Sequence, residues 1–489
     1  MRMKNLFRTV GITVMALALS GIALAQEPVA VGTWTKLTNQ PTFNTDQALL
    51  LTDGTVMMHE FESPNWWRLT PTNTGSYING TWSQMASMQS NYGPLYFASA
   101  VLPDGRVIVE GGEYNCCGGS EVTLGSIYDP VANKWTAVNP PSGWTYIGDS
   151  PGIVLPNGTF MMGQGASPSK RQVEFNATSL TWTAVGTGKA DGFSEEGLAL
   201  LPNGNVLTVD TEDGTNSETF NPTTAAWTSA GSTIVELPNS GGLGIVPEMG
   251  PLMQAPGGYV VAFGATTSNA IYNANTATWS VAPSYPSGDD MADGPAAALP
   301  DGNILVFTSP GVFQGSGTFY EFNGASFTKA PATASAGVEQ SWEGRLMTLP
   351  TGQVLYCAAD GGTIDVEIYT PKGTPKNAWR PKVTSVPTTL THGSSYTVTG
   401  TQLNGLTAGS AYGDDAANAT SYPLVVIRNT ASGHFAFART SNFSQMGIAT
   451  GSLPVTATFA VPAGIETGAS TLYVVANGIA SPGTAVTVN

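Results

Sequence analysis

The sequence has few charged residues, few cysteines and, after its first 25 residues, no long hydrophobic run. Charged residues make up only 11% of the 489-residue chain. That excludes a coiled coil, in which Ala, Glu, Lys, Leu and Arg together supply about half of the residues. Three cysteines without a paired C-x-x-C motif offer no standard zinc site. No later run approaches the roughly 20 apolar residues of a membrane-spanning helix, so we predict no membrane span.

The residues that are abundant point to an all-β protein. Hydrophobic residues reach 41%, which is enough for a core and argues against disorder. The 58 glycines and 33 prolines favour many short strands joined by tight turns. The length allows two or three domains. The 34 acidic residues outnumber the 18 basic ones, so the surface repels phosphate backbones and we expect no nucleic-acid partner.

The N-terminus has the three parts of a secretory signal peptide. Arg2, Lys4 and Arg8 supply positive charge, Val10–Leu19 is apolar, and small residues precede a cleavage site after Ala25. The apolar stretch is too short to span a bilayer, which disfavours a membrane anchor. We therefore expect a signal peptide over residues 1–25 and a secreted or periplasmic mature protein.

A repeat of about 50 residues dominates the chain up to residue 379. Each copy has an apolar strand, a two-residue turn and a second strand, and the turns lie 44 to 54 residues apart. The turns are Asp53-Gly54, Asp104-Gly105, Asn157-Gly158, Asn203-Gly204, Gly257-Gly258, Asp301-Gly302 and Thr351-Gly352. Such dipeptides favour hairpins, and the period is typical of kelch blades.

Aromatic residues recur at matching positions of the third and fourth strands. The third strands contain Tyr128, Phe175, Phe220, Tyr272, Phe322 and Tyr369, and the fourth strands contain Trp82, Trp135, Trp182, Trp227, Trp279 and Phe327. The seventh copy lacks its own fourth strand, whereas Trp34 lies in an isolated strand-like segment near the mature N-terminus. Pairing the two would close a ring and remove its exposed edges. We predict a seven-bladed propeller over residues 26–379, closed by an N-terminal strand.

After a linker over residues 380–387 the repeat ends. Residues 388–489 contain short alternating strands without kelch turns, which predicts one immunoglobulin-like β-sandwich.

This arrangement resembles the galactose oxidase and glyoxal oxidase superfamily, in which a kelch propeller precedes an immunoglobulin-like domain. The segments 402–406, 411–415, 421–423 and 439–444 are similar to the last domain of that family. The resemblance implies a copper ion held partly by histidines, beside a radical tyrosine cross-linked to a cysteine. Tyr96 matches that tyrosine, but Phe443, Trp342-Glu343 and Gln47 stand where the family has a ligand histidine, a Tyr-His ligand pair and the cysteine.

Only three histidines are present, namely His59, His392 and His434, and none is at a ligand position. Because copper(II) sites are typically built on imidazole, we expect no bound copper and assign no metal ligand. Phe443 would instead plug the channel floor.

Carboxylates recur about eight residues before the hairpin turns. That count corresponds to about 26 Å of extended strand, at the mouth of the propeller opposite the turns. The residues placed there are Asp46, Tyr96, Asp149, Glu195, Glu196, Glu248, Asp293, Trp342 and Glu343.

Three interpretations of these crowded acids stay open. A protonated and an ionised carboxyl group could act together on a sugar. The oxygens could share a cation such as Ca²⁺, or they could cap backbone N–H groups where loops enter the strands. For catalysis we select Glu195, Asp293 and Glu343, with Tyr96 as an auxiliary donor. We assign ligand binding to Asp46, Asp149, Glu196, Glu248, Trp342 and Trp66.

Aromatic side chains near the same face favour a carbohydrate ligand, because flat rings stack on sugars. Trp66-Trp67 and Trp144-Thr145-Tyr146 are the candidates, although packing between blades is the better explanation for Trp66 or Trp67 alone, because one of two adjacent strand residues must point each way. Cys116 and Cys117 could form a disulfide with each other, stay free or bond Cys357.

We therefore expect an exported propeller that binds or processes a carbohydrate, as a carboxylate-based hydrolase or lyase if it is an enzyme. A non-catalytic cell-surface or matrix module and a copper oxidase with altered ligands are the alternatives. The sequence does not specify the substrate or the oligomeric state.

Overall fold

The computed structural model describes residues 31–148, 150–165, 168–239, 247–359, 363–412, 416–417 and 421–489. These residues form strands and loops, with three single-turn 3-10 helices, η1 (Pro286–Gly288), η2 (Ser341–Glu343) and η3 (Asn377–Trp379), and no α-helix among them. No helix in the described part of the chain is long and apolar enough to cross a membrane. The all-β prediction is confirmed.

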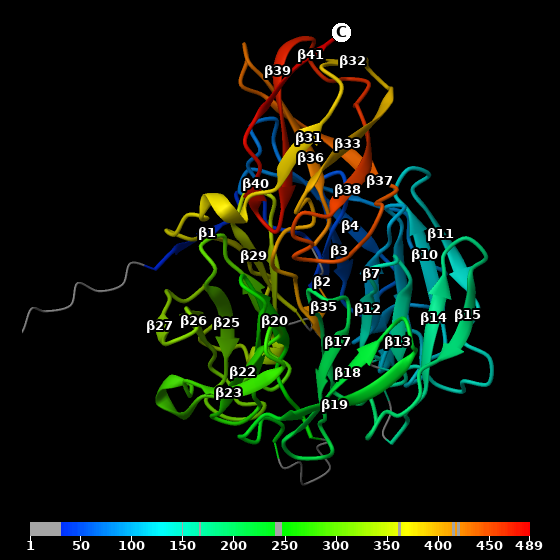
Figure 1. The fold of residues 1–489 in the computed structure, drawn as a ribbon, viewed down its shortest axis with the longest axis vertical. Coiled ribbons are helices and arrows are strands. Elements are labelled where there is room, and N and C mark those ends of the chain that lie inside the picture. Colours follow the sequence, from blue (N-terminus) through cyan, green and yellow to red (C-terminus); the bar gives the residue numbers. More distant parts are fainter. Residues whose placement is uncertain are drawn as a thin grey trace, which may run out of the picture. The chain divides into compact units, whose positions relative to one another are not determined.

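Seven four-stranded antiparallel blades form a propeller (Figure 1). Blade 1 contains β2 (Thr45–Leu50), β3 (Val56–Glu60), β4 (Trp66–Thr70) and β5 (Thr81–Gln84); blade 2 contains β7 (Ala98–Val101), β8 (Val107–Glu110), β10 (Gly125–Asp129) and β11 (Lys134–Val138); blade 3 contains β12 (Gly152–Val154), β13 (Phe160–Gly163), β14 (Gln172–Asn176) and β15 (Thr181–Val185). Blade 4 contains β16 (Gly197–Leu200), β17 (Val206–Val209), β18 (Asn216–Asn221) and β19 (Ala226–Ser232); blade 5 contains β20 (Leu252–Ala255), β21 (Tyr259–Phe263), β22 (Asn269–Asn273) and β23 (Thr278–Ala282). Blade 6 contains β24 (Ala296–Ala298), β25 (Ile304–Thr308), β26 (Thr318–Phe322) and β27 (Phe327–Lys329); blade 7 contains β28 (Gly344–Thr348), β29 (Val354–Ala358), β30 (Val366–Thr370) and β1 (Thr33–Lys36). A short ribbon of β6 (Pro94–Leu95) and β9 (Tyr114–Asn115) lies outside the blades.

Each predicted turn joins the first two strands of a blade. The glycine that ends each turn has a positive φ, from 74° at Gly54 to 92° at Gly302. Only glycine adopts this conformation without a steric penalty, which explains why all seven repeats have one there.

The recurring aromatic residues form cross-strand pairs in the outer half of the blades. Tyr128 lies opposite Trp135, and their ring centroids are 5.1 Å apart. The same pairing recurs between Phe175 and Trp182, Phe220 and Trp227, Tyr272 and Trp279, and Phe322 and Phe327. In blade 1, Leu69 replaces the third-strand ring opposite Trp82. These large side chains fill the wedge that widens between blades.

The N-terminal strand closes the ring as predicted. β1 pairs with β30, and Trp34 lies opposite Tyr369 with ring centroids 4.8 Å apart. The Gly32 N–H donates to the Tyr369 hydroxyl oxygen at 2.7 Å. Blade 7 thus gains the aromatic pair that its own sequence lacks.

The C-terminal part is one curled nine-stranded sheet. It contains β31 (Lys382–Ser385), β32 (Thr389–Leu390), β33 (Ser395–Thr401), β36 (Leu424–Asn429), β37 (Phe435–Ser441), β38 (Pro454–Ala460), β39 (Gly468–Ala476), β40 (Ile479–Ala480) and β41 (Thr484–Val488). β37 pairs with β36 through residues 435–438 and with β38 through residues 439–441. This strand therefore joins the two layers of the predicted sandwich.

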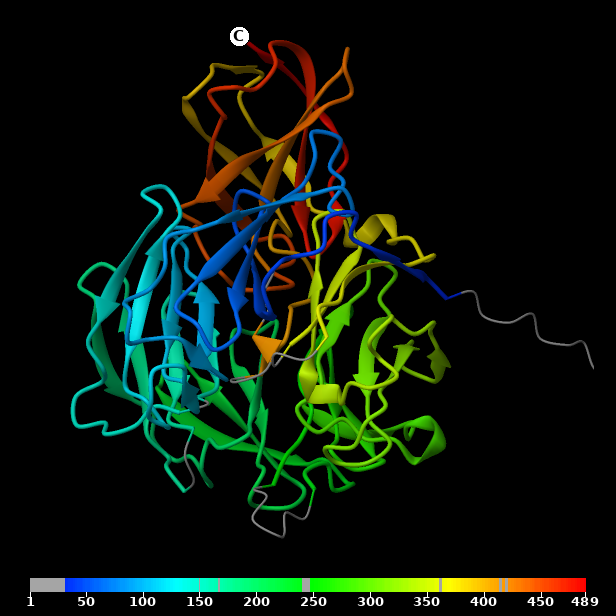
Figure 2. The ribbon, with the colours of Figure 1, turned by 180° about the vertical axis from the view of Figure 1, so that it is seen from behind.

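The C-terminal sheet lies against the hairpin-turn end of the propeller (Figures 1 and 2). The Thr440 N–H donates to the Thr52 carbonyl at 3.0 Å, and the Met446 N–H donates to the Pro156 carbonyl at 2.9 Å. The Tyr422 hydroxyl donates to the Leu50 carbonyl, and Gly352 touches Gly478. Residues 31–489 form one compact unit, and the division at residues 380–387 stays a prediction.

A hairpin from the C-terminal part enters the propeller, which the sequence did not reveal. β34 (Ala411–Tyr412) adds to the inner strand of blade 4, with Tyr412 opposite Gly197, and β35 (Ala416–Ala417) pairs with β34. β35 also lies against β2 and β7, the inner strands of blades 1 and 2. This hairpin therefore occupies the channel and extends to within two residues of Glu195.

Candidate functional site

Three predicted carboxylates from three blades meet where the first strands begin. Glu195, Glu248 and Asp293 precede β16, β20 and β24, and each can direct an oxygen to within 4.8 Å of the others. All three are buried, with 5 to 7% of each residue exposed. We call Glu195, Glu248 and Asp293 the mouth trio. They lie at the end of the propeller opposite the hairpin turns, as the sequence register predicts.

The backbone at the mouth adopts a left-handed conformation in alternate blades. Tyr96, Glu195 and Asp293 have φ values of 51°, 56° and 51° in blades 2, 4 and 6. This conformation costs about 1–2 kcal/mol for a residue with a Cβ atom. Surrounding packing must hold these three residues, and it directs their side chains away from the regular strand positions.

Like charges crowd the blade 6 side of the mouth. Burial, with the neighbouring carboxylates of Asp289 and Asp293, raises the pKa of Asp290 to about 6. Asp289 accepts hydrogen bonds from the hydroxyls of Thr308, at 2.9 Å, and Tyr320, at 3.2 Å. A carboxyl group in this region therefore keeps its proton at mildly acidic pH.

Aromatic rings lie on the other side of the mouth. The Tyr96 ring contacts the Trp342 ring edge to face, with centroids 6.4 Å apart, although blades 2 and 7 supply them. Tyr114 lies 5.9 Å from Tyr96 and Phe313 lies 6.3 Å from Trp342, centroid to centroid. Tyr96 and Trp342 are half-buried, so part of each ring is accessible to a ligand.

Glu343 has a carboxyl partner that the sequence interpretation missed. Burial, together with the charge of Glu343 and a hydrogen bond shared with it, raises the pKa of Glu339 to about 7. Glu343 also accepts a hydrogen bond from the Gln340 N–H at 2.6 Å. Glu339 precedes Glu343 by four residues in the same loop, and this short spacing in the sequence is the signal from which the pair could have been predicted. Glu339 can therefore hold a proton beside Glu343 up to near-neutral pH.

Two other predicted acids form internal ion pairs. Asp46 accepts from His59 Nδ1 at 2.8 Å and lies 3.4 Å from Arg345 Nη2. Burial opposes ionisation of Asp46, but these two partners lower its pKa overall. Asp46 therefore joins blades 1 and 7, and the structure gives it no place in the mouth trio.

Glu196 belongs to a second cluster, built around Lys189. Its carboxylate lies 2.8 Å from Lys189 Nζ and accepts from the Thr208 hydroxyl at 2.9 Å. Lys189 Nζ also contacts Asp191, Asp210 at 3.4 Å and Glu218 at 2.8 Å. We call these five residues the Lys189 cluster.

Trp66 is fully buried and has no surface for a ligand. Its ring packs between those of His59, at 4.7 Å, and Trp135, at 5.5 Å, so it fills the space between blades 1 and 2. The ligand-binding assignment of Trp66 is therefore wrong. Asp149 lies outside the described residues.

Phe443 lies at the hairpin-turn end, far from the mouth trio along the strands. Its N–H donates to the Pro103 carbonyl at 3.3 Å, and its ring stacks on Tyr422 with centroids 6.0 Å apart. It is buried, which agrees with a packing role at the channel floor.

Cys116 and Cys117 form a disulfide with each other, and Cys357 is buried, with its Sγ donating to the Asp46 carbonyl at 3.3 Å. The bridge lies beside β9, whose Tyr114 contacts Tyr96. Of the alternatives left open by the sequence, the adjacent-residue bridge is the one formed.

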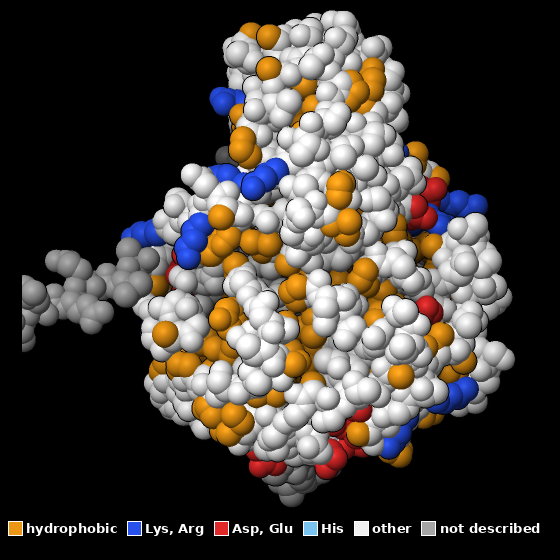
Figure 3. Space-filling view, in the orientation of Figure 1, with side chains coloured by type: hydrophobic (Ala, Val, Ile, Leu, Met, Phe, Trp, Pro, Cys, Tyr) orange, Lys and Arg blue, Asp and Glu red, His pale blue; other side chains and the backbone are white. Residues whose placement is uncertain are grey.

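The visible surface has few charges, and several acidic side chains gather at the propeller edge farthest from the C-terminal sheet (Figure 3). Large areas are white or orange, as expected for a chain with 11% charged residues.

Comparisons with known proteins show which solved structures have a similar fold. No family model and no curated protein matches the sequence. A solved structure described as a novel fungal alcohol oxidase of the AA5 family, in complex with copper, superimposes with a TM-score of 0.51 at 15% identity, covering 94% of this chain and 99% of that chain. The structure of YjhT covers 61% of this chain and 99% of that chain, with a TM-score of 0.41 at 12% identity. The first match confirms the resemblance to the galactose oxidase type at the level of the fold.

Proposed function

We propose that this protein binds and processes a carbohydrate at the mouth of the propeller, with carboxyl groups and without copper-radical chemistry. The observation that supports this most is the convergence of Glu195, Glu248 and Asp293 within 4.8 Å of one another. Three carboxyl groups so close cannot all ionise at low cost, so at least one keeps a proton or shares a cation. A protonated and an ionised carboxyl group side by side are the components of acid-base chemistry on a glycosidic bond.

The Glu339–Glu343 pair supplies a second acid and base at the same mouth. With its pKa raised to about 7 by burial and by Glu343, Glu339 can hold a proton at neutral pH and release it to a leaving group. The half-buried rings of Tyr96 and Trp342 offer flat surfaces on which a sugar can stack. In this proposal Glu343 and Asp293 act directly on the sugar, Glu195 and Glu248 bind its hydroxyls, and Tyr96 donates a hydrogen bond.

The decisive experiment is a polysaccharide panel, read by new reducing ends for hydrolysis and by ultraviolet absorbance of unsaturated products for elimination. Glu343→Gln and Asp293→Asn should each lower turnover at least 100-fold, because an amide can neither donate nor accept a proton in the required step. Glu466→Gln, which changes an exposed carboxylate of the C-terminal sheet, is the matched control and should keep full activity. Binding without turnover would instead indicate a non-catalytic module, and unchanged turnover in both mouth variants would refute the proposal.

The residues available at the mouth do not fit copper. His59 is buried, and both of its ring nitrogens are hydrogen-bonded, to Asp46 and to the Ser63 carbonyl. His392 and His434 belong to the C-terminal sheet region. Carboxylates, a phenol and an indole surround the mouth, whereas copper(II) favours imidazole. Stoichiometric copper in purified protein, with oxidase activity, would overturn this part of the proposal.

The same mouth trio favours a second candidate function, the binding of a divalent cation. Ca²⁺ prefers six to eight oxygen ligands, and three converging carboxylates are a suitable start. Calcium should then raise the unfolding temperature in a concentration-dependent manner, and Asp293→Asn should remove the increase. No calcium-dependent shift would exclude this candidate and leave the sugar proposal untouched.

The disulfide between Cys116 and Cys117 supports an exported protein, because structural disulfides persist in oxidising compartments. Export is tested by comparing the mass of the mature protein with cleavage after Ala25.

A further inference from the structure

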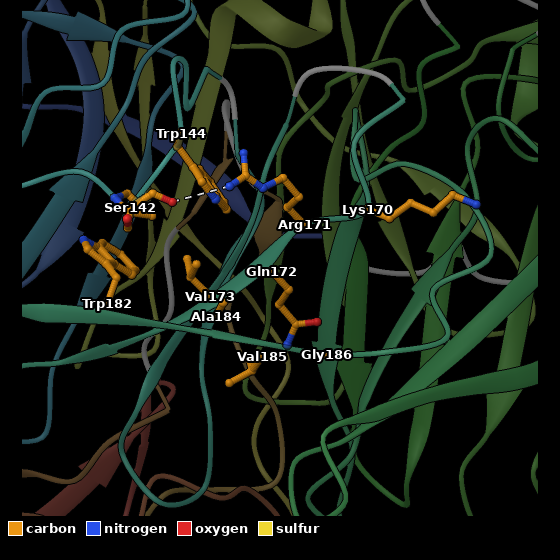
Figure 4. Close-up of a pocket in the computed structure, with 11 residues that line it drawn as sticks. Ser142, Trp144, Lys170, Arg171, Gln172, Val173, Trp182, Ala184, Val185 and Gly186 are labelled. Carbon is orange, nitrogen blue, oxygen red and sulfur yellow. Dashed lines mark hydrogen bonds between the residues drawn. The ribbon is translucent and has the colours of Figure 1, made fainter.

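A separate pocket lies beside the outer strands of blade 3, and none of its lining residues belongs to the mouth trio (Figure 4). The outer strands β14 and β15 and the loop that follows β11 form its walls, around a volume of about 300 Å³. This volume is at the small end of the range for ligand pockets. Its described lining residues include Lys170 and Arg171 but no acidic residue, in a chain with 34 acids and 18 bases.

Arg171 is held in place at one side of the pocket. Its guanidinium lies over the Trp144 ring, 5.5 Å from the centroid, and donates to the carbonyls of Gly143, at 3.0 Å, and Ser142, at 3.4 Å. Since a guanidinium has five N–H donors, these two bonds leave others for a ligand. Lys170 extends away from Trp144 in Figure 4, and its Nζ donates to the Ala190 carbonyl. Arg171 is therefore the main positive charge of the pocket.

Gln172 borders the pocket, but its side chain faces blade 4. Its side-chain oxygen accepts from Trp227 Nε1 at 2.7 Å, and Trp227 lies on β19 of blade 4. Because side chains alternate along a strand, Gln172 points away from Val173 and from the Trp182 ring. A ligand lying on Trp182 therefore meets the donors of Arg171 rather than those of Gln172.

Two tryptophans give the pocket flat apolar walls. Trp144 is buried beneath Arg171, and Trp182 is half-buried with its indole N–H donating to the Asn139 carbonyl at 3.0 Å. In Figure 4, Val173 and Ala184 lie near Trp182, so an apolar floor adjoins the ring.

We propose that this pocket binds an acidic sugar, namely a hexuronate residue of a polysaccharide. The carboxylate would pair with the Arg171 guanidinium, and the apolar face of the sugar ring would lie on Trp182. A simple anion would contact only Arg171, and a neutral sugar would gain nothing from the positive charge of Arg171. The site is independent of the chemistry proposed at the mouth.

The test is calorimetric titration of the purified chain with oligomers of galacturonate and glucuronate, and with neutral oligomers of galactose and glucose. The acidic oligomers should bind at least 10-fold more tightly than the neutral ones, and binding should weaken at high salt. Arg171→Gln and Trp182→Ala should each lower the affinity at least 10-fold.

Arg428→Gln is the matched control, since Arg428 lies over Phe435 at 5.4 Å on the C-terminal sheet. It should bind uronates like the parent chain. Unfolding temperatures show which variants stay folded. Equal affinity for neutral and acidic oligomers, or an Arg171→Gln variant that is folded and binds normally, would overturn the proposal. Inhibition by inorganic phosphate with no sugar binding would reveal a simple anion site and would overturn it too.

Discussion

The second strands of blades 2 and 4 both end in a buried carboxyl group, but the two blades stabilise that group differently. Glu110 ends β8, and neither of its carboxyl oxygens has a hydrogen-bond partner among the described residues. Burial raises its pKa well above the usual value, so it is protonated at neutral pH. Asp210 follows β17 and lies 3.4 Å from the ammonium of Lys189.

The surroundings explain the difference. At blade 2, Gly125 on the neighbouring strand makes room for the carboxyl group, since a Cβ there would lie 2.0 Å from Glu110 Oε2. At blade 4, four carboxylates surround one ammonium. Burial lowers the pKa of Lys189, but those carboxylates outweigh it and raise the pKa overall. A buried carboxyl group can thus be stabilised by keeping its proton or by a neighbouring cation. The two cases predict opposite changes in stability when methionine replaces Lys189 in blade 4 and Glu110 in blade 2.

Lys189→Met should have the largest effect. Removing the ammonium leaves Asp191, Glu196, Asp210 and Glu218 buried beside one another, and the loss of one partner of a buried ion pair costs about 3–5 kcal/mol. The free energy of unfolding, measured with urea, should fall by that amount at pH 7. A loss below about 1 kcal/mol would mean that the carboxylates take up protons and that the ammonium is dispensable.

Glu110→Met should act in the opposite direction. It replaces an unsatisfied polar group with an apolar one of similar length, so the free energy of unfolding should rise by about 1–2 kcal/mol. The gain should be greater at pH 8 than at pH 4. The unfolded carboxyl group ionises near pH 4.5 while the folded one keeps its proton, which costs the parent chain stability as the pH rises. Destabilisation at both pH values would show that Glu110 has a partner.

Asp210→Asn should change the pH profile of stability. The pKa of Asp210 is raised to about 7, by burial and by the carboxylates of Asp191 and Glu218, against the opposing effect of Lys189. Because the unfolded carboxyl group releases its proton near pH 4, this residue lowers stability as the pH rises toward 7. Between pH 5 and pH 7 the parent chain should lose about 2 kcal/mol more than the Asn variant. Parallel profiles would contradict the raised pKa.

Several parts of the fold follow from local sequence. The turn dipeptides and the spaced aromatic residues predict seven blades, and the isolated Trp34 predicts the closing strand that pairs with β30. These features are local because a positive φ at a glycine or a cross-strand ring pair needs only neighbouring residues. The hairpin β34–β35 follows no such rule, because its pairing partner Gly197 is more than 200 residues away.

The candidate site was only partly predictable for the same reason. Counting back from the turns places Glu195, Glu248 and Asp293 at one level, and the structure brings them within 4.8 Å. The count cannot tell that Asp46 turns to His59 and Arg345, or that Glu196 turns to Lys189. Those choices depend on where the strands that carry His59 and Arg345, and the segment that carries Lys189, place their basic groups.

The sequence by itself determined the number of blades, the way the ring closes and the level at which the acids lie. These properties follow from backbone conformation and strand periodicity, which operate over a few residues. Only the tertiary structure decided which acidic side chains contact one another, which contact Lys189, and which pocket Arg171 lines. Such contacts depend on distances of a few ångströms between remote segments, and electrostatic energies change with those distances and with burial, neither of which a local sequence pattern specifies.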